Sequence, residues 1–257
     1  MTITAEPTLV DILKDGRNEL RGRIGDVGGI RAALSDGLFE ILGASRREQP
    51  LVVRASSFRH GSHDPYYSPL GRIRGALVTS VLRLHTAGYV PSDFFEDAVT
   101  AWRASESASE LVEFFNVLDP NERAMLATDV TAHAVTLVTK FGDIPATWRS
   151  RTAVRTSIRL HGGSVLLRDH VDVVIGSNVQ GSGVALIDVT TAPLSPDLER
   201  ALRFHALCES LRGSRPPRMV AAFSTATGEV WRMRVTHDLL ARAVIDLLET
   251  VRNQVAS

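Results

Sequence analysis

Two aspartates interrupt apolar runs in the second half of the sequence. Asp172 lies within "HVDVVIG", and Asp188 follows the apolar stretch of "VALIDVTTA". A carboxylate among apolar side chains is costly without a partner, so each is expected to have one. If these segments are neighbouring antiparallel strands, the carboxylates converge and, with the Val189 carbonyl, would suit a hard cation such as Mg²⁺. The alternative is two strand-end carboxylates that pair with arginines or backbone amides.

The segment that carries both aspartates, residues 150–257, alternates between strand and helix patterns. Gly162-Gly163 separates two alternating runs and predicts a hairpin turn, and Arg168-Asp169 predicts a second bend. Ser195 is the expected cap of a helix that ends at Gly213, and another helix begins at Thr236. The later strands are expected at 171–175, 184–190, 219–224 and 230–235. This order predicts an α/β core with a mixed sheet.

Residues 1–149 carry mostly helical patterns and form the expected N-terminal extension. Asp119 and Pro120 mark the start of a long helix or a helix pair, which ends at Gly142. Residues 54–69 are predicted to be a long loop. Apolar spacing predicts helices within 28–43, 71–88, 92–106 and 119–142. The extension and the α/β core, 150–257, are expected to make one compact unit.

The second half resembles the PD-(D/E)XK nucleases, and among them the RecB-like exonucleases. "RDHVDVVIG" is similar to the first acidic strand of that family, and "ALIDVTTA" is similar to the second. "LERALRFHALCESLR" resembles the helix that follows, and "PLGRIRGALV" resembles a helix before the core. The resemblance implies a restriction-endonuclease-like core, DNA as the partner, and Mg²⁺ or Mn²⁺ held by Asp172, Asp188 and Val189 for phosphodiester hydrolysis.

The departures from the family pattern fall on catalytic positions. Thr190 stands where the family has its lysine, so the cation that orients water and offsets transition-state charge is lost. The helix histidine falls on Gly75, and the glutamine and tyrosine of the RecB-like branch fall on Ala201 and His205. His205 is expected to be a hydrogen-bonded histidine of its helix. These changes indicate an impaired site.

Nuclease activity would require another cation in place of the lost lysine. Lys14 and Lys140 are the only lysines, and Lys140 is the better candidate because it ends a helix just before the core. Arg168 or Arg203 would supply charge but would not act as a base.

Other groups allow weaker predictions. Arg200, Arg203 and Arg212 on one helix are candidate contacts for DNA phosphates, with a solvated basic face as the alternative. "HGSHD" holds His60, His63 and Asp64, which are either metal ligands or part of a polar surface loop. The net charge is zero, so any DNA-binding surface must be a local patch.

Cys208 is the only cysteine, which excludes an intrachain disulfide. No apolar run reaches membrane-spanning length and the N-terminus lacks a signal-peptide pattern, so a cytoplasmic protein is expected. The leading hypothesis is a catalytically impaired RecB-like protein that binds DNA or serves as a partner subunit. An active metal-dependent nuclease with a relocated cation and a protein-binding scaffold are the alternatives. A small-molecule substrate is not expected.

Overall fold

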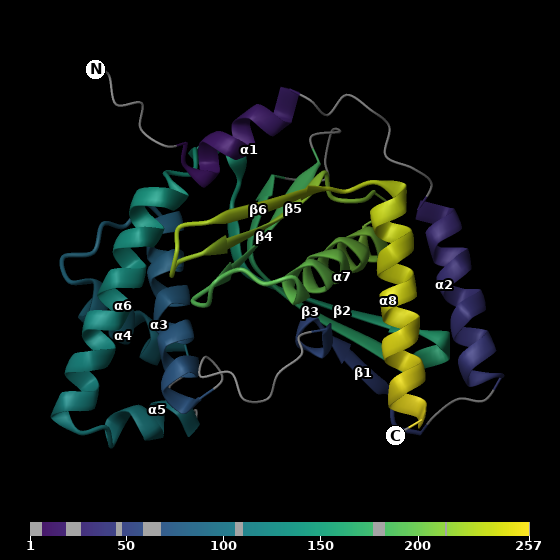
Figure 1. The fold of residues 1–257 in the computed structure, drawn as a ribbon, viewed down its shortest axis with the longest axis horizontal. Helices are drawn as coiled ribbons and strands as arrows, with labels where there is room; N and C mark the ends of the chain where they lie inside the picture. The colour runs from purple at the N-terminus through teal and green to yellow at the C-terminus, as the bar shows by residue number, and fades with distance from the viewer. Residues whose placement is uncertain are drawn as a thin grey trace.

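The computed structural model describes residues 7–18, 27–44, 48–58, 68–105, 110–176, 183–213 and 215–256. A mixed sheet separates two groups of helices (Figure 1). Helices α1 and α3 to α6 share one apolar core with one face of the sheet, and α2, α7 and α8 share a second core with the other face. The mixed α/β class predicted from the sequence is confirmed. None of the described helices is both long and apolar enough to cross a membrane.

The longest of the described helices begins at a capping residue, Asp119. The Asp119 side chain accepts hydrogen bonds from the amides of Asn121 and Glu122, and the Asp119 amide donates to the Glu122 side chain, as in a capping box. The described helices are α1 Leu9–Asn18, α2 Val27–Leu42, α3 Pro69–Thr86, α4 Phe94–Ser105, α5 Glu110–Asn116, α6 Pro120–Phe141, α7 Asp197–Arg212 and α8 His237–Ala256, with short 3-10 turns η1 Ala55–Phe58, η3 Ala146–Trp148 and η4 His161–Gly163.

The sheet is built around one long strand, β3. The strands are β1 Leu51–Arg54, β2 Arg151–Leu160, β3 Val165–Gly176, β4 Val184–Thr190, β5 Met219–Ser224 and β6 Val230–Arg234. β2 pairs antiparallel along almost the whole of one edge of β3. The other edge pairs with β1 at Val165–Arg168 and with β4 at Val173–Gly176. β1 and β4 therefore meet the same edge of β3 and leave a gap between them, which we call the fork, opposite residues 169–172.

β3 also changes face at the fork. Val171 packs in the core beneath α7, whereas Val173 packs in the core beneath α3 and α6. The ladder between β2 and β3 is interrupted at Ala153 on β2 and at Asp172 on β3. The φ of Ala153, 52°, lies in the left-handed region. This irregularity lets Asp169 and Asp172 both lie in the buried layer although they are three residues apart.

Four sequence predictions need correction. Residues 51–54 form a strand of the sheet although they precede the four helices α3 to α6, so the helical half contributes to the α/β layer. β3 runs without a bend through Arg168-Asp169, because its ladder with β2 continues there. Residues 54–58 are strand and 3-10 turn, not loop, and 59–67 lie outside the described residues. Pro196, not Ser195, occupies the cap position of α7 and makes no side-chain cap bond.

Candidate functional site

The fork brings Asp172 and Asp188 together. β3 and β4 are antiparallel, as their convergence required, and both aspartates are buried, with 8% of their surface exposed. The Val189 amide donates a hydrogen bond of 2.7 Å to Asp172 Oδ2. Thus one of the three expected cation ligands contributes an N–H group to the neighbouring carboxyl.

The Asp172 carboxyl favours its neutral form. Burial raises its pKa well above the ordinary value, and the charge of Asp188 and a hydrogen bond with the Asp188 carboxyl raise it further. The Val189 amide and the charge of His205 act in the opposite direction. Two adjacent buried carboxyls that share one proton are the expected result at neutral pH.

His205 on α7 lies above the fork and joins the aspartates. Its Nδ1 atom is 2.6 Å from Asp169 Oδ1, and its Nε2 atom is 3.9 Å from Asp188 Oδ2. Only 1% of its surface is exposed, and Nε2 has no hydrogen-bond partner among the described residues. The imidazole ring therefore lies between two carboxylates that come from different strands.

The electrostatics of this ring favour a cation. Burial alone lowers the pKa of His205, but the charge and hydrogen bond of Asp169, together with Asp188, raise it to about 10. A buried positive charge thus stands beside Asp188 at neutral pH. It offsets the carboxylate charge that a metal ion would otherwise offset.

The acidic residues also contact other groups of the protein. Asp172 accepts a hydrogen bond from the Val189 amide, and the His205 ring lies near Asp188. In the part of the chain that the structure describes, no group of three or more His, Cys, Asp and Glu side chains is arranged to hold a metal. In the metal set predicted from the sequence, Asp172, Asp188 and Val189, the Val189 amide bonds to Asp172 and the His205 ring lies beside Asp188.

Thr190, at the family's lysine position, ends strand β4 and shapes the turn after it. Its Oγ1 accepts the Ala192 amide at 3.0 Å, and its carbonyl accepts both the amide and the hydroxyl of Thr225. These contacts are structural, and they explain a small hydroxyl side chain at this position without any role as a cation.

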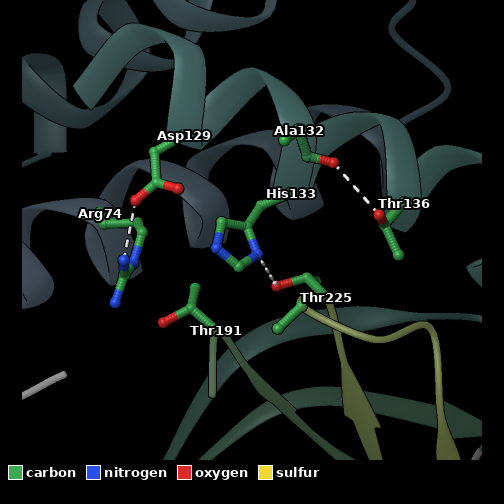
Figure 2. A pocket seen from close by; sticks show the side chains of 8 residues that line it. Arg74, Asp129, Ala132, His133, Thr136, Thr191 and Thr225 are labelled. Carbon is green, nitrogen blue, oxygen red and sulfur yellow. Dashed lines mark hydrogen bonds and ion pairs between the residues drawn. The ribbon is translucent and has the colours of Figure 1, made fainter. Parts of the chain in front are cut away.

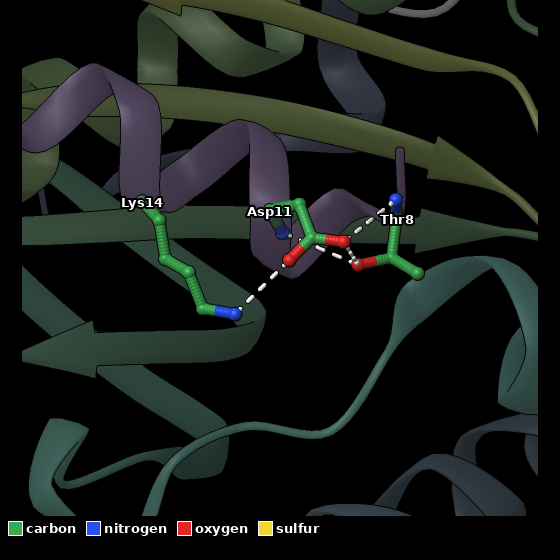
Figure 3. A network of polar contacts seen from close by, with 3 residues as sticks. All are labelled: Thr8, Asp11 and Lys14. Atoms are coloured by element: carbon green, nitrogen blue, oxygen red, sulfur yellow. Dashed lines mark hydrogen bonds and ion pairs between the residues drawn. The ribbon is translucent and has the colours of Figure 1, made fainter. Parts of the chain in front are cut away.

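The two lysines lie on other elements. Lys140, near the end of α6, packs beside Gly228 in the turn between β5 and β6. Lys14 pairs with Asp11 at 3.0 Å on α1, where Thr8 and Asp11 cap the helix (Figure 3). The hydrogen bonds of Thr8 and Lys14 lower the pKa of Asp11 to about 2. The sequence marked His205 as a departure from the family pattern. In the part of the chain that the structure describes, its ring is a cation that lies beside Asp188.

The three arginines expected to contact phosphates are engaged elsewhere. Arg203 bonds to Asp246 of α8 at 2.8 Å and is mostly buried, and Arg200 lies 3.8 Å from the same carboxylate. Arg212 makes two hydrogen bonds, of 2.9 and 2.6 Å, to Glu209. The pairs with Asp246 tie α7 to α8, and the pair with Glu209 lies within α7, so a carboxylate lies beside each of the three arginines.

A separate pocket of about 310 Å³ lies between α3, α6 and the ends of β4 and β5 (Figure 2). His133 Nδ1 lies 2.9 Å from Thr225 Oγ1, and Arg74 pairs with Asp129 at 2.8 Å. Burial, and then the charge of Arg74, lower the pKa of His133, so this ring is neutral. Because Arg74 and Asp129 offset each other, the pocket offers no strong net charge to a metal or a phosphate.

The prediction of a hydrogen-bonded helix histidine at His205 is confirmed, but sequence reasoning missed its partner Asp169. The signal was present in the alternation Val165, Leu167, Asp169, Val171, which places Asp169 on the buried face of its strand. His60, His63 and Asp64 lie outside the described residues. Gly75, at the family's histidine position, has open space where a side chain would be.

Comparison with known proteins gives little information. No protein-family model and no curated protein matches the sequence. A solved structure described as the crystal structure of SSO0001 matches with a TM-score of 0.34 and 10% identity, over 86% of this chain and 84% of that chain. A likeness this distant supports no statement about activity.

Proposed function

We propose that this chain is a RecB-like nuclease-fold protein that binds DNA without cutting it. Two features support the proposal. Asp172 and Asp188, which lie on strands that resemble the acidic strands of the nuclease family, meet at the fork. The position of the family's lysine holds a threonine that is engaged in a turn.

The observation that supports the loss of DNA cleavage is the position of the His205 ring. It lies between Asp169 and Asp188, 2.6 and 3.9 Å from their carboxylate oxygens. A cation in this position repels a divalent metal ion and uses the carboxylates that would bind it. The acidic residues are thereby retained for the stability of the fold and not for phosphodiester hydrolysis.

The test combines cleavage and binding. Labelled single-stranded and duplex DNA are incubated with the wild-type protein and with Asp188→Ala in the presence of Mn²⁺, and binding is followed in parallel without metal. We expect no cleavage by either protein and salt-sensitive binding by the wild type. Mn²⁺-dependent cleavage that Asp188→Ala abolishes would instead establish an active nuclease with a relocated cation.

Metal titration separates these outcomes further. His205→Gln removes the positive charge and keeps a polar side chain of similar reach. If the imidazolium excludes the metal, Mn²⁺ binds this variant more tightly than the wild type in calorimetry. Equal affinities would show that His205 does not control the site. Chemical denaturation of each variant shows whether it is folded.

A further inference from the structure

One face of β1, β2 and β3 is exposed and basic. On the opposite face of these strands, Val53, Val165 and Leu167 are buried beneath α7 and α8. The alternate residues therefore lie on the outward side, and five of them are exposed cations or histidine, which we call the basic face: Arg54, Arg155, Arg159, Arg168 and His170.

The strand register places these side chains next to one another. Arg54 lies opposite Arg168 in the parallel pair of β1 with β3, and Arg155 lies opposite His170 in the antiparallel pair of β2 with β3. Arg54 and Arg168 are like charges directly opposite each other, which destabilises a sheet, whereas burial lowers the pKa of His170 below its ordinary value. The repulsion between the two arginines lowers the stability of the sheet, and no described contact within these strands compensates for it.

No carboxylate offsets this charge among the described residues of the basic face. The remaining outward positions between these cations are Val52, Ser157 and Leu166. None of the four arginines forms an ion pair with another described residue. This separates them from the α7 arginines, whose charges are neutralised by Asp246 and Glu209.

We propose that the basic face binds the phosphate backbone of duplex DNA without reading its sequence. Arginine guanidinium groups match phosphate oxygens in charge and geometry. The described outward positions hold no Phe, Tyr or Trp, the side chains on which proteins stack single-stranded bases. The inference rests on the proposed function, because it names the surface through which DNA is held.

The position of the basic face relative to the fork supports the same partner. Arg168 and His170 flank Asp169 on β3, so the face reaches the gap in which Asp172 and Asp188 lie. Burial lowers the pKa of His170 and the charges of Arg155 and Arg83 lower it further, against the opposing charges of Asp188 and Asp169. Duplex DNA on the basic face would run past the fork.

The experiment measures binding of a short labelled duplex by fluorescence anisotropy over a series of salt concentrations. The double variant Arg155→Ala/Arg168→Ala is compared with Arg242→Ala/Arg252→Ala, which removes the same charge from exposed positions of α8 on the other side of the sheet. We expect the first to bind at least about tenfold more weakly than the wild type and its salt slope to fall by about two, since each phosphate contact contributes roughly one. The α8 variant is expected to bind as the wild type does.

The outcomes separate the surface from the function. Equal binding by the two double variants would overturn the basic face as the binding surface while DNA binding itself stands. Absence of binding by the wild type would overturn the proposed function and this inference with it. Tighter binding of a single strand than of the duplex, lost in Arg155→Ala/Arg168→Ala, would overturn the choice of duplex.

Discussion

The Nδ1 atom of His205 lies 2.6 Å from Asp169 Oδ1, and the side chains of both residues are almost fully buried. The pair joins α7 to β3 across the interior of the protein. Because Asp188 lies on the other side of the same ring, this one histidine connects the helix to two strands that otherwise diverge at the fork. The acidic group is thus part of the core packing as well as a candidate site.

Removal of the Asp169 carboxylate should destabilise the protein strongly. Asp169→Ala leaves a buried imidazole without its closest partner, and breaking a buried pair in this way costs roughly 3–5 kcal/mol. Chemical denaturation measures the loss. The matched control is Glu96→Ala, which breaks an exposed pair with Arg123 and should cost less than about 1 kcal/mol. Equal losses would mean that the His205–Asp169 pair adds nothing beyond a surface pair.

Stability should fall as the pH rises above neutrality. The pKa of His205 is about 10 in the folded protein against an ordinary 6.5, so the stabilisation is complete below about pH 6.5 and is lost as the pH approaches 10. The raised pKa of Asp172 acts with the same sign, since the folded state keeps that proton more tightly. Unfolding free energies measured at regular intervals between about pH 6 and about pH 9.5 check this trend. Asp169→Asn should flatten it, and a flat wild-type curve would contradict it.

The proton on Asp172 predicts different effects of two substitutions. In Asp172→Asn the amide oxygen can still accept the Val189 N–H and the amide nitrogen can donate to Asp188, so we expect a loss below about 1 kcal/mol. Asp172→Ala leaves the Val189 amide without its acceptor and should cost about 1–3 kcal/mol. Denaturation of both variants at neutral pH gives the comparison. If asparagine is as harmful as alanine, Asp172 is ionised in the native protein.

Arg203 should matter for stability and not for DNA binding. Its bond to Asp246 is 2.8 Å long between side chains that are 14% and 13% exposed, so Arg203→Ala should cost about 1–3 kcal/mol. Arg252→Ala, at an exposed position of α8, should change stability by less than about 0.5 kcal/mol. Denaturation and duplex binding are measured on the same preparations. Weaker DNA binding by a folded Arg203→Ala protein would return this arginine to the DNA contacts.

The sequence predicted the pieces of the fold that depend on local patterns. The convergence of Asp172 and Asp188 followed from two apolar strands in succession, and Asp119 and Gly142 marked the ends of α6. Strand β1 was missed because four residues give no periodicity, and its partner β3 is remote in the sequence. A parallel pairing of this kind is decided by tertiary contacts, which local propensity does not contain.

The candidate site was predicted only in part, because it also depends on tertiary contacts. Asp169 follows Arg168, and two adjacent charged residues resembled a bend, although the period-two burial of the strand places Asp169 inward. The role of His205 depends on where α7 crosses the sheet. Only the structure shows that its two ring nitrogens face carboxylates from β3 and β4.

The pairing of β1 with β3 also bears on how the chain is made. Residues 51–54 emerge from the ribosome long before Val165–Arg168, so their hydrogen-bonding edge stays open while α3 to α6 are being synthesised. Such distant pairings form slowly because a long loop must close first. A fragment that began at residue 150 would lack β1 and would present a bare strand edge, a template for aggregation. The two halves that the helix and strand patterns distinguish are therefore joined by this strand pair, which forms only after β3 has been translated.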